Sequence, residues 1–220
     1  MKLYDSHGPN PYTVRLFILE RSGISLDIEP IDILNLENRR HGYISDVNSR
    51  GEIPALRLDN GIVLTEITAI CEYLDEIATA GETLIGTNAE ERAETRMWTR
   101  RVYLEICQNF VNWWRNGEDA TDFYRGHRIP IPSARDAEKL ITNQALNRLD
   151  ADLEGKTFIC GDRLTLADIV LFGFFNTMLP VVPWLNPPGR LNVVAWFERM
   201  SSRTNCAKAL VPFSRGAFSS

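Results

Sequence analysis

The stretch of residues 51–78 constrains the fold of this chain more than any other. It begins with a short strand that carries Ile53-Pro54, turns at Asp59-Asn60-Gly61 into a second strand, and ends in an amphipathic helix. Asn-Gly between two apolar runs is a strong hairpin signal because both residues tolerate a positive φ. Pro54 cannot donate to a ladder, so it marks a bulge, an edge or a cis turn where the strand begins. The hairpin therefore brings a helix N-terminus beside a strand entry that a proline fixes.

This construction suits a peptide-like anionic ligand. The strand entry exposes unpaired backbone groups, and the N-terminus of the following helix offers N–H donors and partial positive charge to a carboxylate. Glu66, at the start of that helix, can bind an ammonium group. A ligand that carries both an α-amino group and an α-carboxylate would satisfy both features.

Two separate motifs resemble those of cytosolic glutathione S-transferases. The first resembles the glutathione-binding stretch of that family and consists of Ile53-Pro54-Ala55-Leu56, Asn60-Gly61, Leu64-Thr65-Glu66, Ala69-Ile70 and Tyr73-Leu74. The second resembles the buried N-cap of a core helix and consists of Phe158-Ile159, Gly161-Asp162, Leu164-Thr165 and Ala167-Asp168. The two motifs lie far apart, and the resemblance covers nearly the whole chain. It implies an α/β thioredoxin-like N-terminal domain followed by an all-α C-terminal helical bundle.

The order of predicted elements agrees with that fold. Residues 1–79 predict strand, helix and strand, followed by the hairpin and its helix, which is the thioredoxin-like order. Residues 80–86 predict a linker, and residues 87–220 an all-helical domain that contributes the hydrophobic substrate site. Within the first domain, we expect Asn10 to cap a helix that continues with Pro11.

Three further helix starts are expected in the helical domain, from pairs of residues spaced as in a capping box. They are Thr87 with Glu90, Ser133 with Asp136, and Thr165 with Asp168. In the last pair, the Asp168 carboxylate should accept a hydrogen bond from the backbone N–H of Thr165, which makes Asp168 a structural residue.

Composition excludes several other classes of function. The formal net charge of −5 does not favour nucleic-acid binding, which needs clustered Lys and Arg. The four cysteines lie far apart without a CxxC pair, which argues against disulfides, a metal site or a dithiol redox centre. The N-terminus does not resemble a signal peptide, and no apolar run is long enough to span a membrane. We therefore expect a cytoplasmic protein without a metal.

The resemblance places the thiol chemistry in residues 6–13. A free thiol has a pKa of roughly 8.5, so glutathione chemistry needs donors that favour the thiolate. Many bacterial relatives carry Ser-Pro-Asn before the first helix, with the serine on the sulfur, whereas this chain has Gly8 at that position. Nu-class relatives use the Asn amide, so Asn10 is the first candidate for thiolate stabilisation. Ser6, Tyr12 and Tyr4 are weaker candidates, and the alternative for Asn10 is a helix cap alone.

The resemblance also implies the residues that hold glutathione. The backbone of Ile53 should bind the cysteinyl amide, with Pro54 fixing the bend. Glu66 and the backbone of Ile67 should hold the γ-glutamyl end, and Arg39 could bind the glycine carboxylate in place of a frequent His. The alternative for Arg39 is a solvated loop residue.

The helical domain should supply the wall for a hydrophobic substrate. The candidates are aromatic residues, of which the first belongs to the N-terminal domain: Tyr12, Tyr103, Phe110, Trp113 and Trp114. An aromatic stripe at helical spacing is more often core than ligand site, so we expect about two of the four in the helical domain to reach substrate. Adjacent Trp113 and Trp114 cannot face the same way.

Together, these observations predict a glutathione S-transferase-like enzyme that uses the glutathione thiolate on a small hydrophobic electrophile, as in detoxification. Glutathione is the co-substrate, and most relatives are homodimers. Activity could be weak because Gly8 replaces the serine. The alternatives are a glutathione-dependent disulfide-bond reductase and a non-catalytic adaptor or ligand-binding relative.

Overall fold

A computed structural model describes residues 1–185 and 189–218. The chain forms two compact units, which are described separately below. The first unit comprises Met1–Thr87 together with Ser201–Ser220, and the second comprises Asn88–Met200. The C-terminal segment thus belongs with the N-terminal unit. The division into residues 1–79, a linker 80–86 and residues 87–220 stays a prediction.

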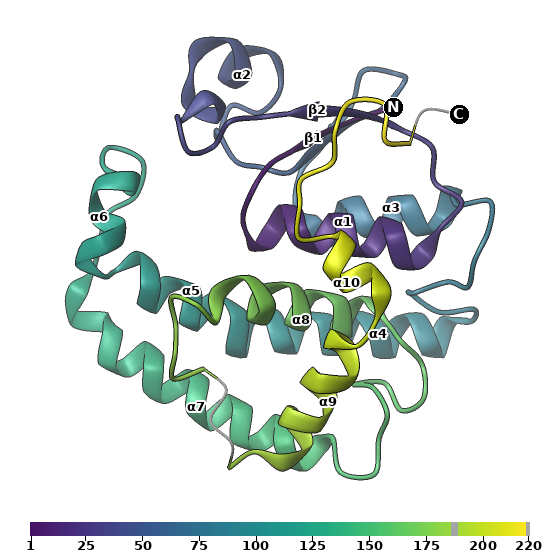
Figure 1. Ribbon diagram of the computed structural model, residues 1–220, viewed down its shortest axis with the longest axis vertical. Coiled ribbons are helices and arrows are strands. Elements are labelled where there is room, and N and C mark those ends of the chain that lie inside the picture. The colour runs from purple at the N-terminus through teal and green to yellow at the C-terminus, as the bar shows by residue number, and fades with distance from the viewer. Residues whose placement is uncertain (186–188, 219–220) are drawn as a thin grey trace. The chain divides into compact units, whose positions relative to one another are not determined.

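The first unit contains a four-stranded mixed sheet (Figure 1). Its strands, in the spatial order β2-β1-β3-β4, are β1 (Lys2–Asp5), β2 (Asp27–Pro30), β3 (Ala55–Arg57) and β4 (Val63–Leu64). β1 runs parallel to β2 and antiparallel to β3, and β3 pairs antiparallel with β4. This topology confirms the thioredoxin-like fold predicted for the N-terminal part of the chain.

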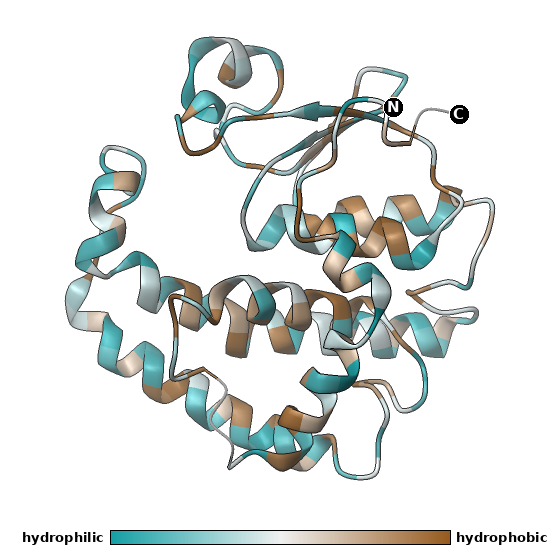
Figure 2. Cartoon of the chain, in the orientation of Figure 1, coloured by the Kyte–Doolittle hydropathy of each residue, from teal (hydrophilic) through white to brown (hydrophobic). Residues whose placement is uncertain are grey.

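The helices of the first unit are α1 (Pro9–Arg21), the 3₁₀ turn η1 (Glu37–Arg39), α2 (His41–Asp46), α3 (Ile67–Ile77) and α10 (Thr204–Lys208). α1 packs against α3, and apolar residues recur along both helices (Figure 2). The fully buried residues of this unit include Leu3, Phe17, Leu56 and Ile70, so one core joins the sheet to both helices.

The hairpin between β3 and β4 has the predicted turn. The N–H of Leu58 donates to the carbonyl of Ile62 at 2.8 Å, and Gly61 takes a φ of 88°. Leu56 pairs with Leu64 across the ladder. Because glycine has no Cβ, it adopts this positive φ at low cost. The turn therefore fixes the register that brings the start of α3 back beside the start of β3.

The regular elements of the second unit, among its described residues, are all helices, and short bridges join Phe158 to Gly161 and Cys160 to Arg163. Its elements are α4 (Ala89–Arg101), the π-helical stretch η2 (Val102–Cys107), α5 (Gln108–Arg115), α6 (Glu118–Tyr124), the 3₁₀ turn η3 (Pro132–Ala134), α7 (Arg135–Asp152), α8 (Leu166–Met178) and α9 (Leu191–Ser201). α8 is the central element, since all but two of its residues are buried. α4, η2 and α5 follow one another without a break and pack against α7 and α8.

Asp168 has the structural role that its motif predicts. Its carboxylate accepts hydrogen bonds from the Thr165 N–H at 3.0 Å, the Ile159 N–H at 2.9 Å and the Trp196 indole N–H at 2.9 Å. The capping box with Thr165 is complete. Burial raises the pKa of the Asp168 carboxyl, while these hydrogen bonds lower it. Asp168 thus joins the start of α8 to α9 and to the loop before it.

Three predicted helix starts are wrong. α1 begins at Pro9, with Gly8 as its N-cap at a φ of 115°, so Asn10 lies inside the helix. Pro9 and Pro11 both suit the first turn of a helix. The helix begins at Pro9 because Gly8, as its N-cap, can adopt the positive φ that this start requires. Asn88, not Thr87, caps α4 by accepting from the Glu91 N–H at 2.9 Å.

The third wrong start is that of α7, which Ser133 and Asp136 were expected to cap. The helix follows the 3₁₀ turn Pro132–Ala134 directly, and no side chain caps it. None of the helices in residues 1–185 and 189–218 is long and apolar enough to cross a membrane.

Candidate functional site

Three predicted segments meet at one end of the sheet in the first unit. β1 ends at Asp5, β3 begins at Ala55 opposite Tyr4, and β4 ends at Leu64 opposite Leu56. Continuing these antiparallel registers by one or two residues brings the Ile53-Pro54 segment beside both Ser6 and Glu66. The loop before α1, the entry to β3 and the start of α3 therefore share one edge. We call this edge the sheet-end site.

The entry to β3 presents free backbone groups. The Ile53–Pro54 peptide bond is cis, and the side chain of Ile53 is buried. No hydrogen bond joins the backbone of Ile53 to another described residue. An extended peptide could pair with this N–H and C=O as a further strand would.

The start of α3 presents N–H donors. Ile67 is its first residue, and no side chain caps the helix. Glu66, just before it, has an exposed side chain and a φ of 70°, which is rare for a residue with a Cβ. Strained backbone of this kind is often found where a ligand binds. The free N–H groups suit a carboxylate, and the Glu66 carboxylate beside them suits an ammonium group.

The first turn of α1 has few donors. Pro9 and Pro11 lack an N–H, so Asn10 has the only backbone N–H among the first three helical residues. Its side chain is half-buried and forms no hydrogen bond with the described residues. Asn10 is therefore the residue of this turn that can donate to an anion at the positive end of the helix dipole.

Ser6 is placed differently from Asn10. Its side chain is buried, and its hydroxyl donates to the Ile31 carbonyl at 2.6 Å. A hydroxyl has one proton, so in this structure it has none for a thiolate. Ser6 supports the loop rather than offering a donor.

Arg39 ends η1 beside the strand entry. The Cγ of Arg39 lies 3.6 Å from the point where a Cβ on Gly51 would stand, and Gly51 is two residues before Ile53. The neighbouring Asn38 amide donates to the Gly51 carbonyl at 2.5 Å. Arg39 thus lies beside the segment that carries Ile53, and its role in binding the glycine carboxylate stays a prediction.

The sequence analysis missed the residues that hold this segment. Tyr43, on α2, donates its hydroxyl to the Glu52 carbonyl at 2.9 Å, and the Asn48 amide donates to the same oxygen at 3.0 Å. Burial raises the pKa of Tyr43 well above its usual value, so the hydroxyl keeps its proton. The spacing of Tyr43 and Val47 was the available signal, because apolar residues at i and i+4 share one face of a helix.

Tyr12 does not lie on a ligand-accessible surface. Its ring is fully buried, and its hydroxyl donates to the Cys206 carbonyl at 2.9 Å. The expectation that Tyr12 contacts substrate or sulfur is therefore corrected: this residue ties α1 to the C-terminal segment.

The aromatic candidates of the second unit divide into two groups. Phe110 is fully buried against Phe174 and Phe175, so it belongs to the core and its expected contact with substrate is corrected. Tyr103 is half-buried and packs edge-on against Phe174 at 5.7 Å.

Trp113 and Trp114 are half-buried and point to different neighbours. Trp113 packs edge-on against Trp184 at 5.2 Å and lies under the guanidinium of Arg135. Trp114 packs against Tyr124 at 6.1 Å. The two tryptophans therefore face different ways, and each keeps some exposed surface.

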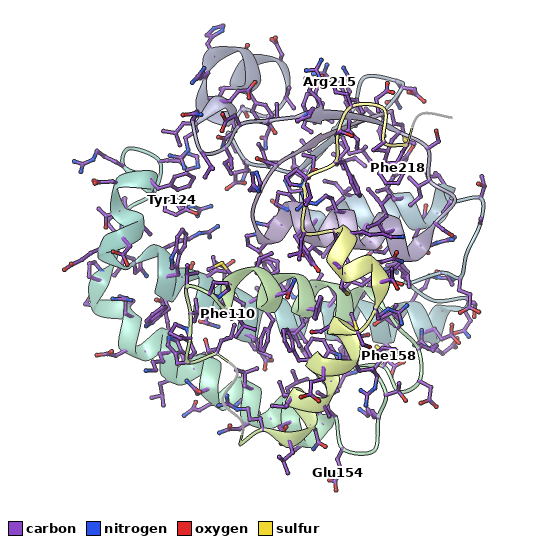
Figure 3. The ribbon with its side chains drawn as sticks, in the orientation of Figure 1. Phe110, Tyr124, Glu154, Phe158, Arg215 and Phe218 are labelled. Carbon is purple, nitrogen blue, oxygen red and sulfur yellow. The ribbon has the colours of Figure 1, made fainter. Side chains whose placement is uncertain are left out.

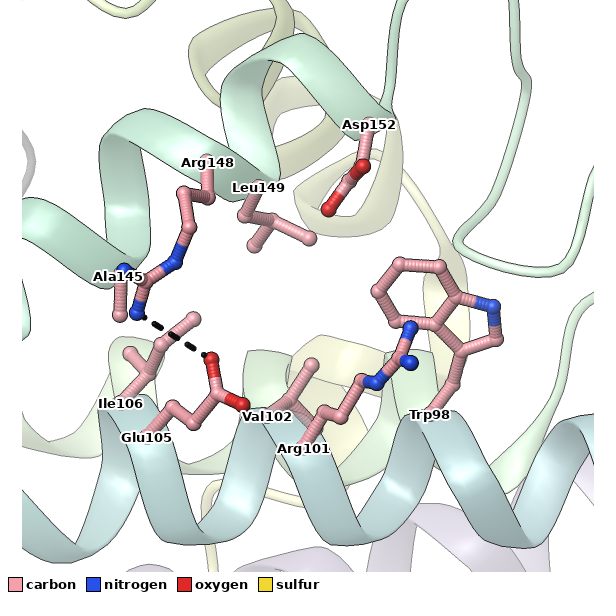
Figure 4. A pocket seen from close by; sticks show the side chains of 9 residues that line it. All are labelled: Trp98, Arg101, Val102, Glu105, Ile106, Ala145, Arg148, Leu149 and Asp152. Carbon is pink, nitrogen blue, oxygen red and sulfur yellow. Dashed lines mark hydrogen bonds and ion pairs between the residues drawn. The ribbon is translucent and has the colours of Figure 1, made fainter.

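The second unit also has a cavity of about 230 Å³ between α4, η2 and α7 (Figure 4). Its floor is apolar and its mouth is charged, with these residues: Trp98, Arg101, Val102, Glu105, Ile106, Ala145, Arg148, Leu149 and Asp152. At the mouth, Arg148 pairs with Glu105 at 3.4 Å. None of the predicted site residues lines this cavity.

The four cysteines are buried and none forms a disulfide. Burial raises the pKa of the thiol in each: Cys71, Cys107, Cys160 and Cys206. A buried neutral thiol is a poor nucleophile. Among residues 1–185 and 189–218, no cluster of His, Cys, Asp and Glu could hold a metal ion. Any sulfur nucleophile at the sheet-end site would thus have to come from the ligand.

Comparisons with known proteins agree with this geometry. Residues 9–77 match the family described as "Glutathione S-transferase, N-terminal domain", and residues 130–204 match "Glutathione S-transferase, C-terminal domain". The chain is 29% identical over 211 residues to glutathione S-transferase GstA of Escherichia coli O157:H7, which covers 96% of this chain and 97% of that protein.

Two other relatives extend the comparison. A crystal structure of a glutathione S-transferase domain-containing protein of Marinobacter aquaeolei VT8 superposes with a TM-score of 0.84 at 26% identity, over 94% of this chain and all of the other. Elongation factor 1-gamma of Prunus avium is 27% identical over 169 residues, which cover 74% of this chain and 38% of that protein. Both domains and their order are thus accounted for, and the chain belongs to the glutathione S-transferase family.

Proposed function

We propose that this protein is an enzyme that binds glutathione at the sheet-end site and uses its thiolate on a small hydrophobic electrophile. The observation that carries the proposal is the meeting of the unpaired Ile53 backbone with the uncapped start of α3 at one end of the sheet. Both features recognise backbone amides and α-amino acid groups, which glutathione carries. Membership of the glutathione S-transferase family supports the same ligand.

The ligand would lie along the entry to β3. Ile53 pairs with the cysteinyl amide, and Pro54 shapes the bend. At one end, the γ-glutamyl ammonium pairs with Glu66 while its carboxylate accepts from the Ile67 N–H. At the other end, Arg39 binds the glycine carboxylate. Each of these pairings joins complementary charges or hydrogen-bonding groups.

The thiolate would be stabilised by Asn10. Each pKa unit by which the site lowers the thiol pKa corresponds to about 1.4 kcal/mol of preference for the thiolate. Gly8 supplies no hydroxyl, so Asn10 acts without the serine that many relatives have, and we expect modest activity. Tyr103, Trp113 and Trp114 would contribute the apolar surface for the electrophile.

Glutathione affinity of two matched variants tests the proposal. Glu66→Gln removes the charge that pairs with the γ-glutamyl ammonium, whereas Glu76→Gln removes an exposed charge from the far end of the same helix. We expect calorimetry to show glutathione binding to the unmodified protein, at least fivefold weaker binding to Glu66→Gln and unchanged binding to Glu76→Gln. Equal affinities for both variants, or no binding by the unmodified protein, would refute the assignment of the site.

A non-catalytic or disulfide-reducing role is the second candidate. The missing hydroxyl at Gly8 favours it, as does the similarity to an elongation factor subunit. Turnover separates the possibilities once binding is established. An aryl halide consumed with glutathione supports the transferase, a disulfide reduced by glutathione supports the reductase, and neither reaction supports an adaptor.

We also propose that the protein is a homodimer, as most relatives are. Sedimentation equilibrium should then give twice the chain mass of 25.0 kDa. Because dissociation accompanies unfolding of a dimer, the thermal midpoint should rise with protein concentration. A mass of 25.0 kDa, that of a single chain, at all protein concentrations would contradict the homodimer.

A further inference from the structure

The C-terminal segment, residues 201–218, is bound to the N-terminal strand and helix of the first unit. The Tyr12 hydroxyl of α1 donates to the Cys206 carbonyl, and the Ser25 hydroxyl donates to the Phe218 carbonyl at 3.0 Å. Arg203 pairs with Glu20 near the C-terminal end of α1 through two hydrogen bonds, of 2.9 and 2.6 Å. Arg215, near Phe218 in Figure 3, pairs with Glu29 of β2. The segment therefore follows α1 and β2 closely.

Arg15 is the buried centre of this packing. Its side chain is 1% exposed, and its guanidinium donates in three directions. The Nε donates to the Ala209 carbonyl at 2.8 Å, and Nη1 donates to the Asp5 carboxylate at 2.7 Å and to the Ser6 carbonyl at 2.6 Å. One side chain thus joins the end of β1, the loop before α1 and the C-terminal segment.

Asp5 completes the same network. Its Oδ1 accepts from Arg15, and its Oδ2 accepts from the backbone N–H of Phe213 at 2.9 Å. Its side chain has no exposed surface. Burial raises the pKa of the Asp5 carboxyl, and the Arg15 charge lowers it. Oδ2 therefore has this partner only while the C-terminal segment is in place.

The loop after Ser6 leads directly to Asn10. Arg15 fixes the carbonyl of Ser6, and the Ser6 hydroxyl is bonded to Ile31, so this residue is held from both sides. The next two residues, His7 and Gly8, bring the chain into α1, whose first N–H donor belongs to Asn10. A shift of the Ser6 carbonyl would be passed on to the start of the helix over a few bonds.

We propose that Arg15 is a positioning residue for the thiol site, which it sets by tying the Ser6–Asn10 loop to the backbone of the C-terminal segment, directly at Ala209 and through Asp5 at Phe213. This inference rests on the proposed function, since it concerns the same glutathione thiol. It assigns the last part of the chain a role in the chemistry of the N-terminal unit. That role is distinct from the contribution of the segment to stability.

The test uses pairs of full-length variants. Arg15→Lys keeps the charge beside Asp5 but cannot donate to three acceptors in a fork. Phe213→Pro removes the N–H that Asp5 accepts, and its partner Phe213→Ala removes the ring but keeps the N–H. Glu20→Gln is the control, since it weakens another tether between α1 and the C-terminal segment, at Arg203, near the opposite end of the helix.

The readouts are the pKa of bound glutathione, from its ultraviolet thiolate absorbance, and the separate values of kcat and KM. For Arg15→Lys and Phe213→Pro, we expect the thiol pKa to rise by at least half a unit and kcat to fall at least threefold, with KM changed less than twofold. Phe213→Ala and Glu20→Gln should leave the thiol pKa unchanged, even where their thermal midpoints fall.

The outcomes separate this inference from the proposed function. If the unmodified protein binds no glutathione, the proposed function fails. If it binds glutathione and all four variants titrate alike, Arg15 has only a structural role and the inference is overturned. Should Arg15→Lys not fold, the Phe213→Pro and Phe213→Ala pair is decisive, because both lack the phenyl ring and only Phe213→Pro lacks the backbone N–H.

Discussion

Asn10 could affect the stability of α1 or the pKa of the bound thiol, and the structure distinguishes these two effects. As a helix cap, its replacement by alanine would lower the free energy of unfolding by about 1 kcal/mol. Gly8 is the cap, however, and the Asn10 side chain makes no hydrogen bond with the described residues. We therefore expect Asn10→Ala to change the free energy of unfolding by less than about 0.5 kcal/mol. Any loss of activity would then come from the site itself.

The same variant should raise the pKa of bound glutathione by up to about one unit, because the amide donor at the helix N-terminus is lost. Thiolate absorbance of the complex across pH measures this directly. His7→Ala is the control, since His7 is exposed in the same loop. Identical titrations of the two variants would exclude Asn10 from contact with the sulfur.

The cysteines supply another prediction for single residues. Burial raises the pKa of Cys206 to about 12, so at pH 8 this thiol is protonated in nearly every molecule. The other three thiols are also buried. We expect a thiol reagent to label none of the four within minutes in the native state and all four after denaturation. Rapid labelling of a single native cysteine would reopen a mechanism through a protein thiolate.

Among the elements, the segment after α3 is held by Asp75. This carboxylate accepts from Arg21 Nε at 2.8 Å and from the Leu84 N–H at 2.9 Å, and it is 7% exposed. Removing one partner of a buried ion pair leaves an uncompensated charge, which costs about 3–5 kcal/mol. Asp75→Ala should lower the free energy of unfolding in urea by about 3 kcal/mol. For its exposed neighbour, Glu76→Ala, the change should stay within about 0.5 kcal/mol.

Local patterns predicted the elements whose determinants are local. The Asn60-Gly61 turn and the Thr165-Asp168 capping box each depend on residues within a few positions, and both have the predicted form. The predicted start of α1 was wrong because either of two prolines fits a first helical turn. Which proline begins the helix depended on the backbone conformation of Gly8. α2 was missed because it is only six residues long within a polar stretch.

For the candidate site, the sequence indicated which residues lie close together. It did not indicate the hydrogen-bond partners or the burial of each side chain. Ile53, Glu66 and Ile67 are indicated by their motif, and the sheet register brings them together. Whether Ser6 offers its proton depends on Ile31, 25 residues away. The network of Asp5 and Phe213 spans 208 residues, so no local pattern could reveal it. Burial likewise separates Phe110 from the tryptophans that keep some exposed surface.

At the scale of the whole molecule, the proposed function assigns different ligands to the two units. Glutathione would bind to the first unit, through backbone groups that are unpaired in the free protein, such as the N–H of Ile53 and of Ile67. The hydrophobic electrophile would contact the aromatic residues of the second unit. Amide hydrogen exchange along the chain can distinguish the two contributions, because a newly bonded N–H exchanges more slowly.

Glutathione alone should slow exchange in residues 51–56 and 65–70 and leave residues 103–114 unchanged. An apolar analogue of the electrophile should slow exchange in residues 103–114, because it would contact Trp113 or Trp114. At a glutathione concentration 100 times the dissociation constant, the protein should also gain about 2.7 kcal/mol in its free energy of unfolding. In Glu66→Gln, the protection of residues 65–70 at the same concentration should decrease. Protection by glutathione that appears only in the helical unit would contradict the sheet-end site, since its free backbone groups would then have no ligand.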